Sequence, residues 1–132
     1  NEPRVRYRFV LEFRARIEAD LQKLSSLTPN WDAYGAPRID PQIIKVSREF
    51  ASKLPEHLIT PPAVVPMVPG NLQFEWHRGT RSLEFEFELP NRIHYLKWDP
   101  EDGVEEEGFF SAENKERAVS LICWFVETAA DV

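Results

Sequence analysis

Glycine and cysteine are scarce in this chain. The five glycines among its 132 residues are all isolated, so the sequence has no glycine-rich loop of the kind that cradles phosphates. The single cysteine, Cys123, has no partner in the chain for a disulfide. Its apolar neighbours in LICWF predict a buried structural thiol rather than a nucleophile.

Long apolar runs are also missing. The sequence has no stretch of about 18 apolar residues that would cross a bilayer, and its first residues lack the order of a secretion signal. We therefore expect a soluble, cytoplasmic protein that does not bind membranes. The length suits one domain with a single apolar core, so we predict one α+β domain over residues 1–132. The chain begins at Asn1 rather than at methionine, so these expectations concern these residues alone.

Catalytic signatures are missing as well. The three histidines, His57, His77 and His94, are accompanied by no glycine-flanked serine and no oxyanion loop. The histidine and cysteine spacings that typically bind metals do not occur either. We therefore predict no catalytic residue, no metal ligand and no cofactor, and the sequence favours a non-enzymatic protein.

Acidic residues dominate the middle of the chain. The formal net charge is −6, and nine acids against two basic residues lie between Glu84 and Glu107. The first 20 residues instead hold five arginines against four acids. An acidic domain repels the phosphate backbone, which disfavours nucleic acid and favours a protein partner with a basic surface. The alternative interpretation is a solvated surface that only confers solubility.

The first third of the chain has the periodicity of a helix. Residues 4–27 repeat apolar side chains at helical spacing from Phe9 onward, and Pro29 ends the pattern. The alternation of Arg4, Arg6 and Arg8 with apolar residues leaves an extended start as an alternative. We predict one long helix over residues 4–27.

Two further helices follow from capping signals. Asp40 is predicted as an N-cap with proline in the first turn, and Pro55 ends this second helix. One of its sides carries either Ile43, Ser47, Phe50 and Leu54 or Ile43, Val46 and Phe50. The last helix is predicted to open at Ser111 as N-cap and to bury Ala118, Leu121, Ile122, Phe125 and Val126.

The middle of the chain alternates apolar and polar side chains, which is typical of strands with one buried face. NLQFEWH and SLEFEFEL give two such strands, and Gly79-Thr80 fits a two-residue turn with glycine first. A shift of one residue would mix the two faces. This turn therefore predicts that Trp76 lies opposite Leu83, Phe74 opposite Phe85 and Glu75 opposite Glu84.

Other extended segments flank this hairpin. A third strand, RIHYLKW, follows a loop for which we favour three residues, placing Phe87 opposite Tyr95 and Glu88 opposite His94. With a two-residue loop, His94 would lie on the apolar face. A fourth strand is predicted at residues 104–110, where the run EEE makes an edge that resists pairing with other chains. Residues 63–65, among prolines, are either a short edge strand or an extended connector.

These elements predict an α+β fold in two layers. An antiparallel sheet of about four strands, ordered as a meander, has two N-terminal helices and one C-terminal helix on its apolar face. Opposed like charges on the other face cost up to about 1 kcal/mol per pair. A solvated surface, a surface for a basic protein partner and a metal site remain as interpretations of that face. It is expected to carry Gln73, Glu75, His77, Glu84, Glu86, Glu88 and, in the favoured register, His94.

The segment PNWDAYGAPRI, residues 29–39, joins the first two helices, and we call it the corner loop. Asn30 and Asp32 are suited to hydrogen-bond nearby backbone, and Gly35 supplies a positive φ. We expect Trp31 and Tyr34 to plug the core from this loop, with contact to a partner as the alternative.

The stretch NWDAYGAP, followed by PPAVVP, a glycine and LQFEWH, resembles a group of small, mostly uncharacterised bacterial proteins that share an NWD-x-Y-GA motif and a VVP…LQFEW strand. The resemblance covers about residues 24–90. It departs at Ala33, where glycine or serine is common, and at Met67-Val68-Pro69, where a more polar turn is usual. The resemblance implies an accessory or antagonist role in toxin–antitoxin or defence modules.

Together these observations predict a non-catalytic protein–protein interaction module, antitoxin-like or otherwise an accessory or antagonist protein, that binds a basic partner through an acidic sheet face. The alternative hypothesis is a small metal- or ligand-binding domain, with or without enzymatic activity, centred on Glu75, His77, Glu84 and Glu86. The predicted partner-binding residues are Trp31, Tyr34, Glu75, His77, Glu84, Glu86 and Glu88.

Overall fold

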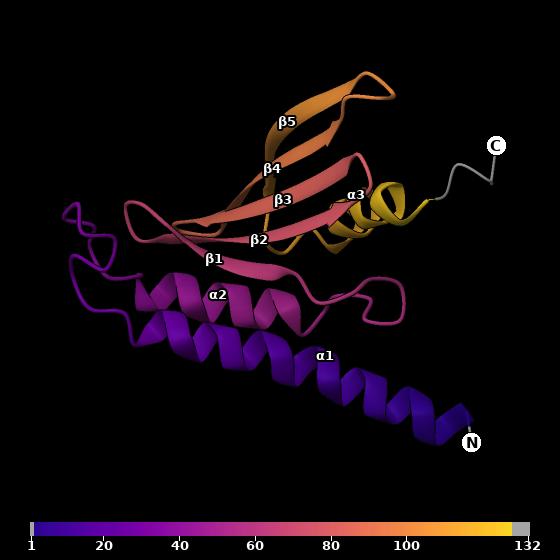
Figure 1. Ribbon diagram of the computed structural model, residues 1–132, viewed down its shortest axis with the longest axis horizontal. Coiled ribbons are helices and arrows are strands. Elements are labelled where there is room, and N and C mark those ends of the chain that lie inside the picture. The colour runs from indigo at the N-terminus through magenta and orange to yellow at the C-terminus, as the bar shows by residue number, and fades with distance from the viewer. Residues whose placement is uncertain (1, 128–132) are drawn as a thin grey trace.

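The computed structural model describes residues 2–127, with side chains from Glu12 onward (Figure 1). The described strands form one antiparallel sheet in the order β1-β2-β3-β4-β5, so each strand pairs with its neighbours in sequence. The predicted α+β meander is confirmed, with five strands in place of about four. The elements are α1 (Glu2–Ser25), α2 (Pro41–Ala51), β1 (Ala63–Met67), β2 (Asn71–Arg78), β3 (Arg81–Glu88), β4 (Arg92–Asp99), β5 (Val104–Ser111) and α3 (Lys115–Val126).

The fifth strand is β1, the segment that the sequence leaves open between an edge strand and a connector. It pairs with β2 over its whole length, with Ala63 opposite Glu75 and Met67 opposite Asn71. Pro66 lies within it and has no N–H to offer a further neighbour, which suits an edge position. On the helical side, β1 contacts α1.

The predicted register of the central hairpin is confirmed. Phe74 lies opposite Phe85 and Glu75 opposite Glu84, as the Gly79-Thr80 turn requires. Gly79 has a φ of 59°, a left-handed conformation that glycine adopts without strain.

The predicted register of the next pair, β3 and β4, is wrong by two residues. Phe87 lies opposite Ile93, not Tyr95, and Glu88 lies opposite Arg92, not His94. The loop does contain three residues, as predicted, and it spans residues 89–91. The residues that flank it, Glu88 and Arg92, pair directly with each other, whereas the predicted register leaves Arg92 without a partner. Because the shift is even, the faces are as predicted: His94 lies on the side of the glutamates, opposite Glu86.

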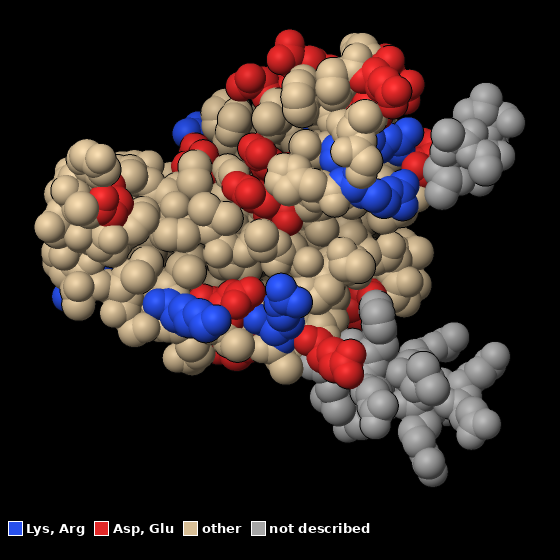
Figure 2. All heavy atoms as spheres, in the orientation of Figure 1, with Lys and Arg blue, Asp and Glu red and all other residues tan. Residues whose placement is uncertain are grey.

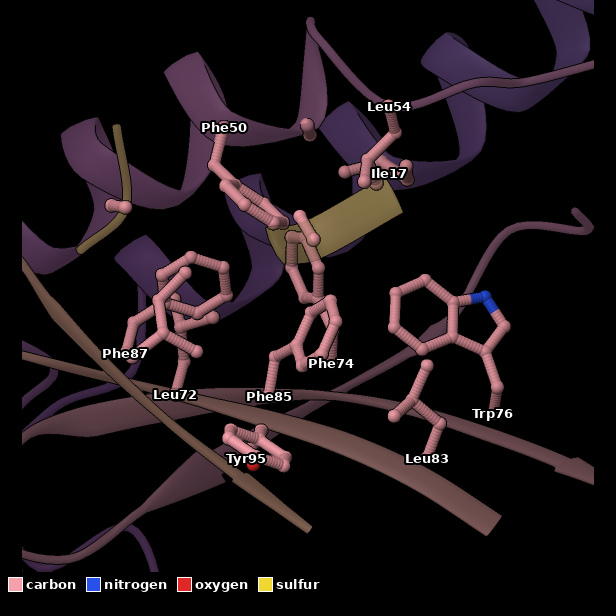
Figure 3. Packing of buried hydrophobic residues seen from close by; sticks show 14 of the residues in the cluster. Ile17, Phe50, Leu54, Leu72, Phe74, Trp76, Leu83, Phe85, Phe87 and Tyr95 are labelled. Carbon is pink, nitrogen blue, oxygen red and sulfur yellow. The ribbon is translucent and has the colours of Figure 1, made fainter. Parts of the chain in front are cut away.

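The apolar core lies between the sheet and the helices (Figure 3). Phe50 of α2 projects into the rings of the central hairpin, with centroids 5.3 Å from Phe87 and 5.8 Å from Phe85. The rings of Phe74 and Phe87 lie 4.8 Å apart. Each fully buried side chain of this kind contributes about 1.5–3 kcal/mol relative to an exposed one. All three helices add buried residues to this one cluster, including Phe13, Ile17 and Leu21 of α1, Ile43 of α2, and Leu121, Ile122 and Phe125 of α3.

The two N-terminal helices follow the predictions closely. The helix α1 is continuous from Glu2 to Ser25, so the extended start is wrong; the side chains of Arg4, Arg6, Arg8 and Phe9 lie outside the described residues. In α2, the predicted N-cap is confirmed: a carboxylate oxygen of Asp40 accepts a hydrogen bond of 2.8 Å from the Gln42 N–H. This helix ends at Ala51, four residues before Pro55.

Two predictions about the C-terminal helix are wrong. Ser111 does not begin it but ends β5, opposite Arg92, and Asn114 is the N-cap, accepting from the Arg117 N–H. Cys123 is exposed rather than buried, because the buried side of α3 carries Leu121, Ile122 and Phe125. Within the described residues, no helix is both long and apolar enough to cross a membrane.

Candidate functional site on the open sheet face

The sheet face that points away from the helices, which we call the open face, carries side chains of β2–β5 in cross-strand rows. Strand alternation brings the predicted residues Glu75, His77, Glu84, Glu86 and Glu88 together on it. In Figure 2, acidic atoms gather over the part of the molecule where Figure 1 places β3–β5. From β2 to β5, the rows are Gln73, Glu86, His94 and Phe109; Glu75, Glu84, Leu96 and Glu107; and His77, Ser82, Trp98 and Glu105.

Most carboxylates on the open face have a local partner that offsets their mutual repulsion. Such contacts at partly exposed positions contribute little each, on the order of 1 kcal/mol or less, but together they fix where the negative charges lie. Glu75 accepts from Gln73 (2.6 Å), Glu86 from Asn71 (3.1 Å) and Glu88 from Arg92 (2.9 Å), and Glu107 lies 3.0 Å from Nε2 of His94.

Glu84 and Glu105 are the exceptions; Glu105 is exposed at the β5 edge, whereas Glu84 lies at the centre of the face. Among the described residues, no side chain hydrogen-bonds to Glu84 or forms an ion pair with it. Partial burial raises the pKa of its carboxyl group, and the negative charge of Glu75 directly opposite raises it further. Glu84 is therefore the half-buried carboxylate of the open face that has neither a hydrogen-bond donor nor a cation among the described side chains.

Two exposed aromatic side chains accompany the acids, and the sequence analysis missed both. Trp98 is 41% exposed and Phe109 is 56% exposed. The guanidinium of Arg92 lies 4.2 Å from the centroid of the Phe109 ring, and the His94 ring lies 5.0 Å from it. The alternation in RIHYLKW places Trp98 in phase with His94, and in the pair Phe109-Phe110 one ring must face outward; these were the available signals.

His77 and Ser82 form the contact on this face that most resembles catalytic chemistry. Nδ1 of His77 lies 2.9 Å from the Ser82 hydroxyl, and Nε2 lies 3.6 Å from a carboxylate oxygen of Glu75. The His77 side chain is 57% exposed on a flat strand, open to water. A nucleophilic serine needs donors converging on an oxyanion and a cleft that holds the substrate, and this hairpin surface supplies neither.

The alternative of a metal site gains no support from the geometry. Among the described side chains, residues 12–127, no three histidine, cysteine, aspartate or glutamate groups are placed to hold one ion. The strand pairing places Glu75 and His77 on β2 and Glu84 and Glu86 on β3.

The corner loop is a self-contained turn in the helical layer. Asp32 accepts hydrogen bonds from the N–H groups of Tyr34 (2.9 Å) and Ala36 (3.0 Å), which lower the pKa of its carboxyl group. Asn30 accepts from the Gly35 N–H at 2.7 Å, and Gly35 has a φ of 86°. These are the local roles that the sequence predicts for Asn30, Asp32 and Gly35.

The two aromatic residues of the corner loop differ. Trp31 packs partly against the core and donates from Nε1 to the Pro37 carbonyl at 2.8 Å, as expected of a plug. Tyr34 is 91% exposed, so its prediction as a plug is wrong: the turn that Asp32 holds directs it outward. Neither residue lies on a strand of the open face, so the structure does not bring them together with the glutamates.

Comparisons of the chain with protein-family models, with curated proteins and with solved structures found no match.

Proposed function

We propose that this chain is a non-catalytic protein–protein interaction module that binds a basic partner protein through the open face. The supporting observation is Glu84, a half-buried carboxylate that faces Glu75 and has no cation beside it among the described residues. A lysine or arginine of a partner placed over this pair would offset both the repulsion and the cost of burial.

The exposed aromatic residues fit the same role. Trp98 and Phe109 flank the acidic rows on β4 and β5, where large rings provide apolar contact area beside the charges. Aromatic anchors surrounded by polar groups are typical of interface centres. Tyr34, exposed on the corner loop, is a candidate second contact, whereas Trp31 serves the loop itself.

The antitoxin-like part of the proposal rests on the resemblance of residues 24–90 to small bacterial proteins. Antagonists of this type bind a partner tightly without transforming it, and an acidic surface speeds association with a basic one. The predicted cytoplasmic location belongs to the same proposal.

A pair of charge-matched variants tests the open face. The variant Glu84→Lys, Glu86→Lys changes the formal charge from −6 to −2, because each substitution adds two. The control Glu101→Lys, Glu116→Lys makes the same change at exposed positions on the β4–β5 loop and on α3. Affinity capture from the native host should recover a basic protein with the wild type and the control but lose it with the first variant.

Two results would contradict the proposal. Equal capture by both variants would show that charge at the open face is not used. Stoichiometric metal in the purified wild type, lost in the Glu84→Lys, Glu86→Lys variant while the fold is unchanged, would support the metal-binding alternative instead.

A further inference from the structure

The outer edge of β5 is an open end of the sheet. The strand order leaves β1 and β5 as the two edges. The β1 edge carries Pro66 and contacts α1, which limits its pairing with another strand. The β5 edge runs over eight residues at the side of the sheet away from α1 and α2 (Figure 1).

The pattern of hydrogen bonds identifies the backbone groups at that edge. Ala112 donates to the Asn91 carbonyl at 3.0 Å, which continues the register that pairs Ile93 with Phe110. Hydrogen-bonded pairs alternate along an antiparallel ladder, so Phe110, Gly108 and Glu106 bond to β4. The N–H and C=O groups of Glu105, Glu107 and Phe109 therefore point outward.

These outward groups have no protein partner within residues 2–127. Besides its ladder with β4, the strand takes part in one further backbone hydrogen bond to described residues, from the Asn114 N–H to the Ser111 carbonyl at its end. Contacts on the core side of the sheet also hold β5 to β4 and α3. Tyr95 lies over Gly108, and its hydroxyl donates to Glu106 at 2.6 Å and accepts from Arg117 at 2.7 Å.

The side chains of the edge determine what can pair with it. Glu105, Glu107 and Phe109 project onto the open face, so two negative charges and one exposed ring line the edge. A second copy of β5 would place the run EEE against itself, which opposed like charges disfavour. A strand with positive charges opposite Glu105 and Glu107 meets no such penalty.

We propose that the outer edge of β5 binds an extended, basic segment of the partner protein as a sixth, antiparallel strand. Opposite Phe109 this segment carries an apolar side chain, and opposite Glu107 and Glu105 it carries lysine or arginine, in that order along its sequence. Backbone bonds to the edge hold the segment, and the alternating side chains select it. The inference rests on the proposed function and adds to it how the partner docks and which sequence pattern it has.

A dye-labelled peptide of valine, threonine and lysine tests the inference. One valine is placed to lie opposite Phe109, and lysines two and four residues after it are placed to lie opposite Glu107 and Glu105. Two further versions of the peptide carry N-methyl groups on every second backbone amide, one version on the odd-numbered amides and the other on the even-numbered amides; we call these the two phases. One phase removes the N–H groups that would face β5, and the other removes those that face solvent. Composition and charge are identical, and the protein is unchanged.

We expect the first phase to weaken binding by at least about tenfold and the second by less than about threefold, since each lost bond costs a small factor. Amides of Glu105, Glu107 and Phe109 should exchange with solvent at least about tenfold more slowly once the parent peptide is bound. Equal weakening in both phases, or no preference over a peptide with glutamates in place of the lysines, would overturn the inference.

Protein variants separate this inference from the proposed function. Glu107→Pro removes an outward N–H, whereas Glu107→Gln removes only the charge; the first should abolish peptide binding and the second should weaken it about two- to fivefold. Loss of partner capture in Glu84→Lys, Glu86→Lys with full capture by Glu107→Pro would overturn strand addition and leave the open face standing. A dimer of the free chain that the peptide disrupts would show a second copy, not a basic segment, as the occupant.

Discussion

Glu84 lies directly opposite Glu75 across the central hairpin, and it is the half-buried carboxylate of the open face with which no described side chain forms a hydrogen bond or an ion pair. A free protein that keeps this arrangement gives up stability for it. A substitution that removes the charge of Glu84 should therefore raise the stability of the free protein.

The variant Glu84→Gln should be more stable than the wild type at pH 7, by about 0.5–1 kcal/mol, because it removes one of two opposed like charges. The pKa of Glu84 is raised in the folded state above its ordinary value of 4.5, so the folded protein keeps this proton to higher pH than the unfolded chain. The destabilisation by the Glu84 charge is therefore absent below the ordinary pKa, grows as the pH rises from there to the raised pKa, and is complete above it. Urea unfolding should show the gain at pH 7 and none near pH 4.

The variant Glu106→Gln provides a control of opposite sign in the same sheet. The hydrogen bond from the Tyr95 hydroxyl is the main cause that lowers the pKa of Glu106, with Lys97 and Arg117 adding to it. Its contribution is present at neutral pH and is lost as pH falls through the lowered pKa. We expect Glu106→Gln to cost about 0.5–1.5 kcal/mol at pH 7. A loss that stays constant down to acidic pH would contradict this role of the carboxylate.

Gly108→Ala should destabilise the protein by about 1–3 kcal/mol, because the new Cβ would lie 3.0 Å from Cε1 of Tyr95, whose hydroxyl is held by Glu106 and Arg117. Thermal or urea unfolding measures the loss, and Glu105→Ala, on the same strand and exposed, is the control. In a Tyr95→Leu background the cost of the alanine should largely vanish, since the clash is gone. An undiminished cost there would mean that another contact is responsible.

Ala33→Gly should stabilise the protein by about 0.5–1 kcal/mol. Ala33 has a φ of 67°, a conformation that costs a residue with a Cβ more than it costs glycine. The matched control is Ala36→Gly: Ala36 is buried in the same loop, and its φ is not positive, so glycine there should destabilise. Chemical denaturation of the two variants compares them directly, and a loss of stability in both would exclude strain at Ala33.

Amide hydrogen exchange in the free protein should alternate along β5. The N–H groups of Glu106, Gly108 and Phe110 bond to β4 and should exchange slowly, whereas those of Glu105, Glu107 and Phe109 face solvent and should exchange fast. Residue-resolved exchange by NMR measures this. Protection of all six amides in the free protein would mean that the outer edge is already occupied.

Much of the fold was predictable because local signals agreed with one another. The alternation in NLQFEWH and SLEFEFEL and the glycine of the turn leave one register for the central hairpin, and the structure has it. The proline-rich stretch at residues 61–69 was ambiguous, because whether an extended segment pairs depends on a neighbour distant in sequence. Only the free edge of β2 decides that β1 is a strand.

The errors have physical causes of the same kind. Ser111 has the chemistry of an N-cap, but the ladder to Arg92 extends β5 through it, and Asn114 caps α3 instead. Cys123 has apolar neighbours in the sequence, but in the helix α3 it lies on the exposed side, whereas the residue before it, Ile122, lies on the buried side. Alternation along the strands predicted which glutamates lie on the open face. It could not predict that Glu84 lacks a partner among the described side chains, because that depends on which neighbours the long side chains of β2, β3 and β4 contact.

The exposed Cys123 is the one thiol in the chain, and it lies on α3, behind the sheet as seen from the open face. A maleimide dye or a nitroxide spin label would therefore attach at one site without covering the glutamates or the β5 edge. With a second label at one end of a bound segment, the distance between the two labels would show in which direction that segment runs along the sheet.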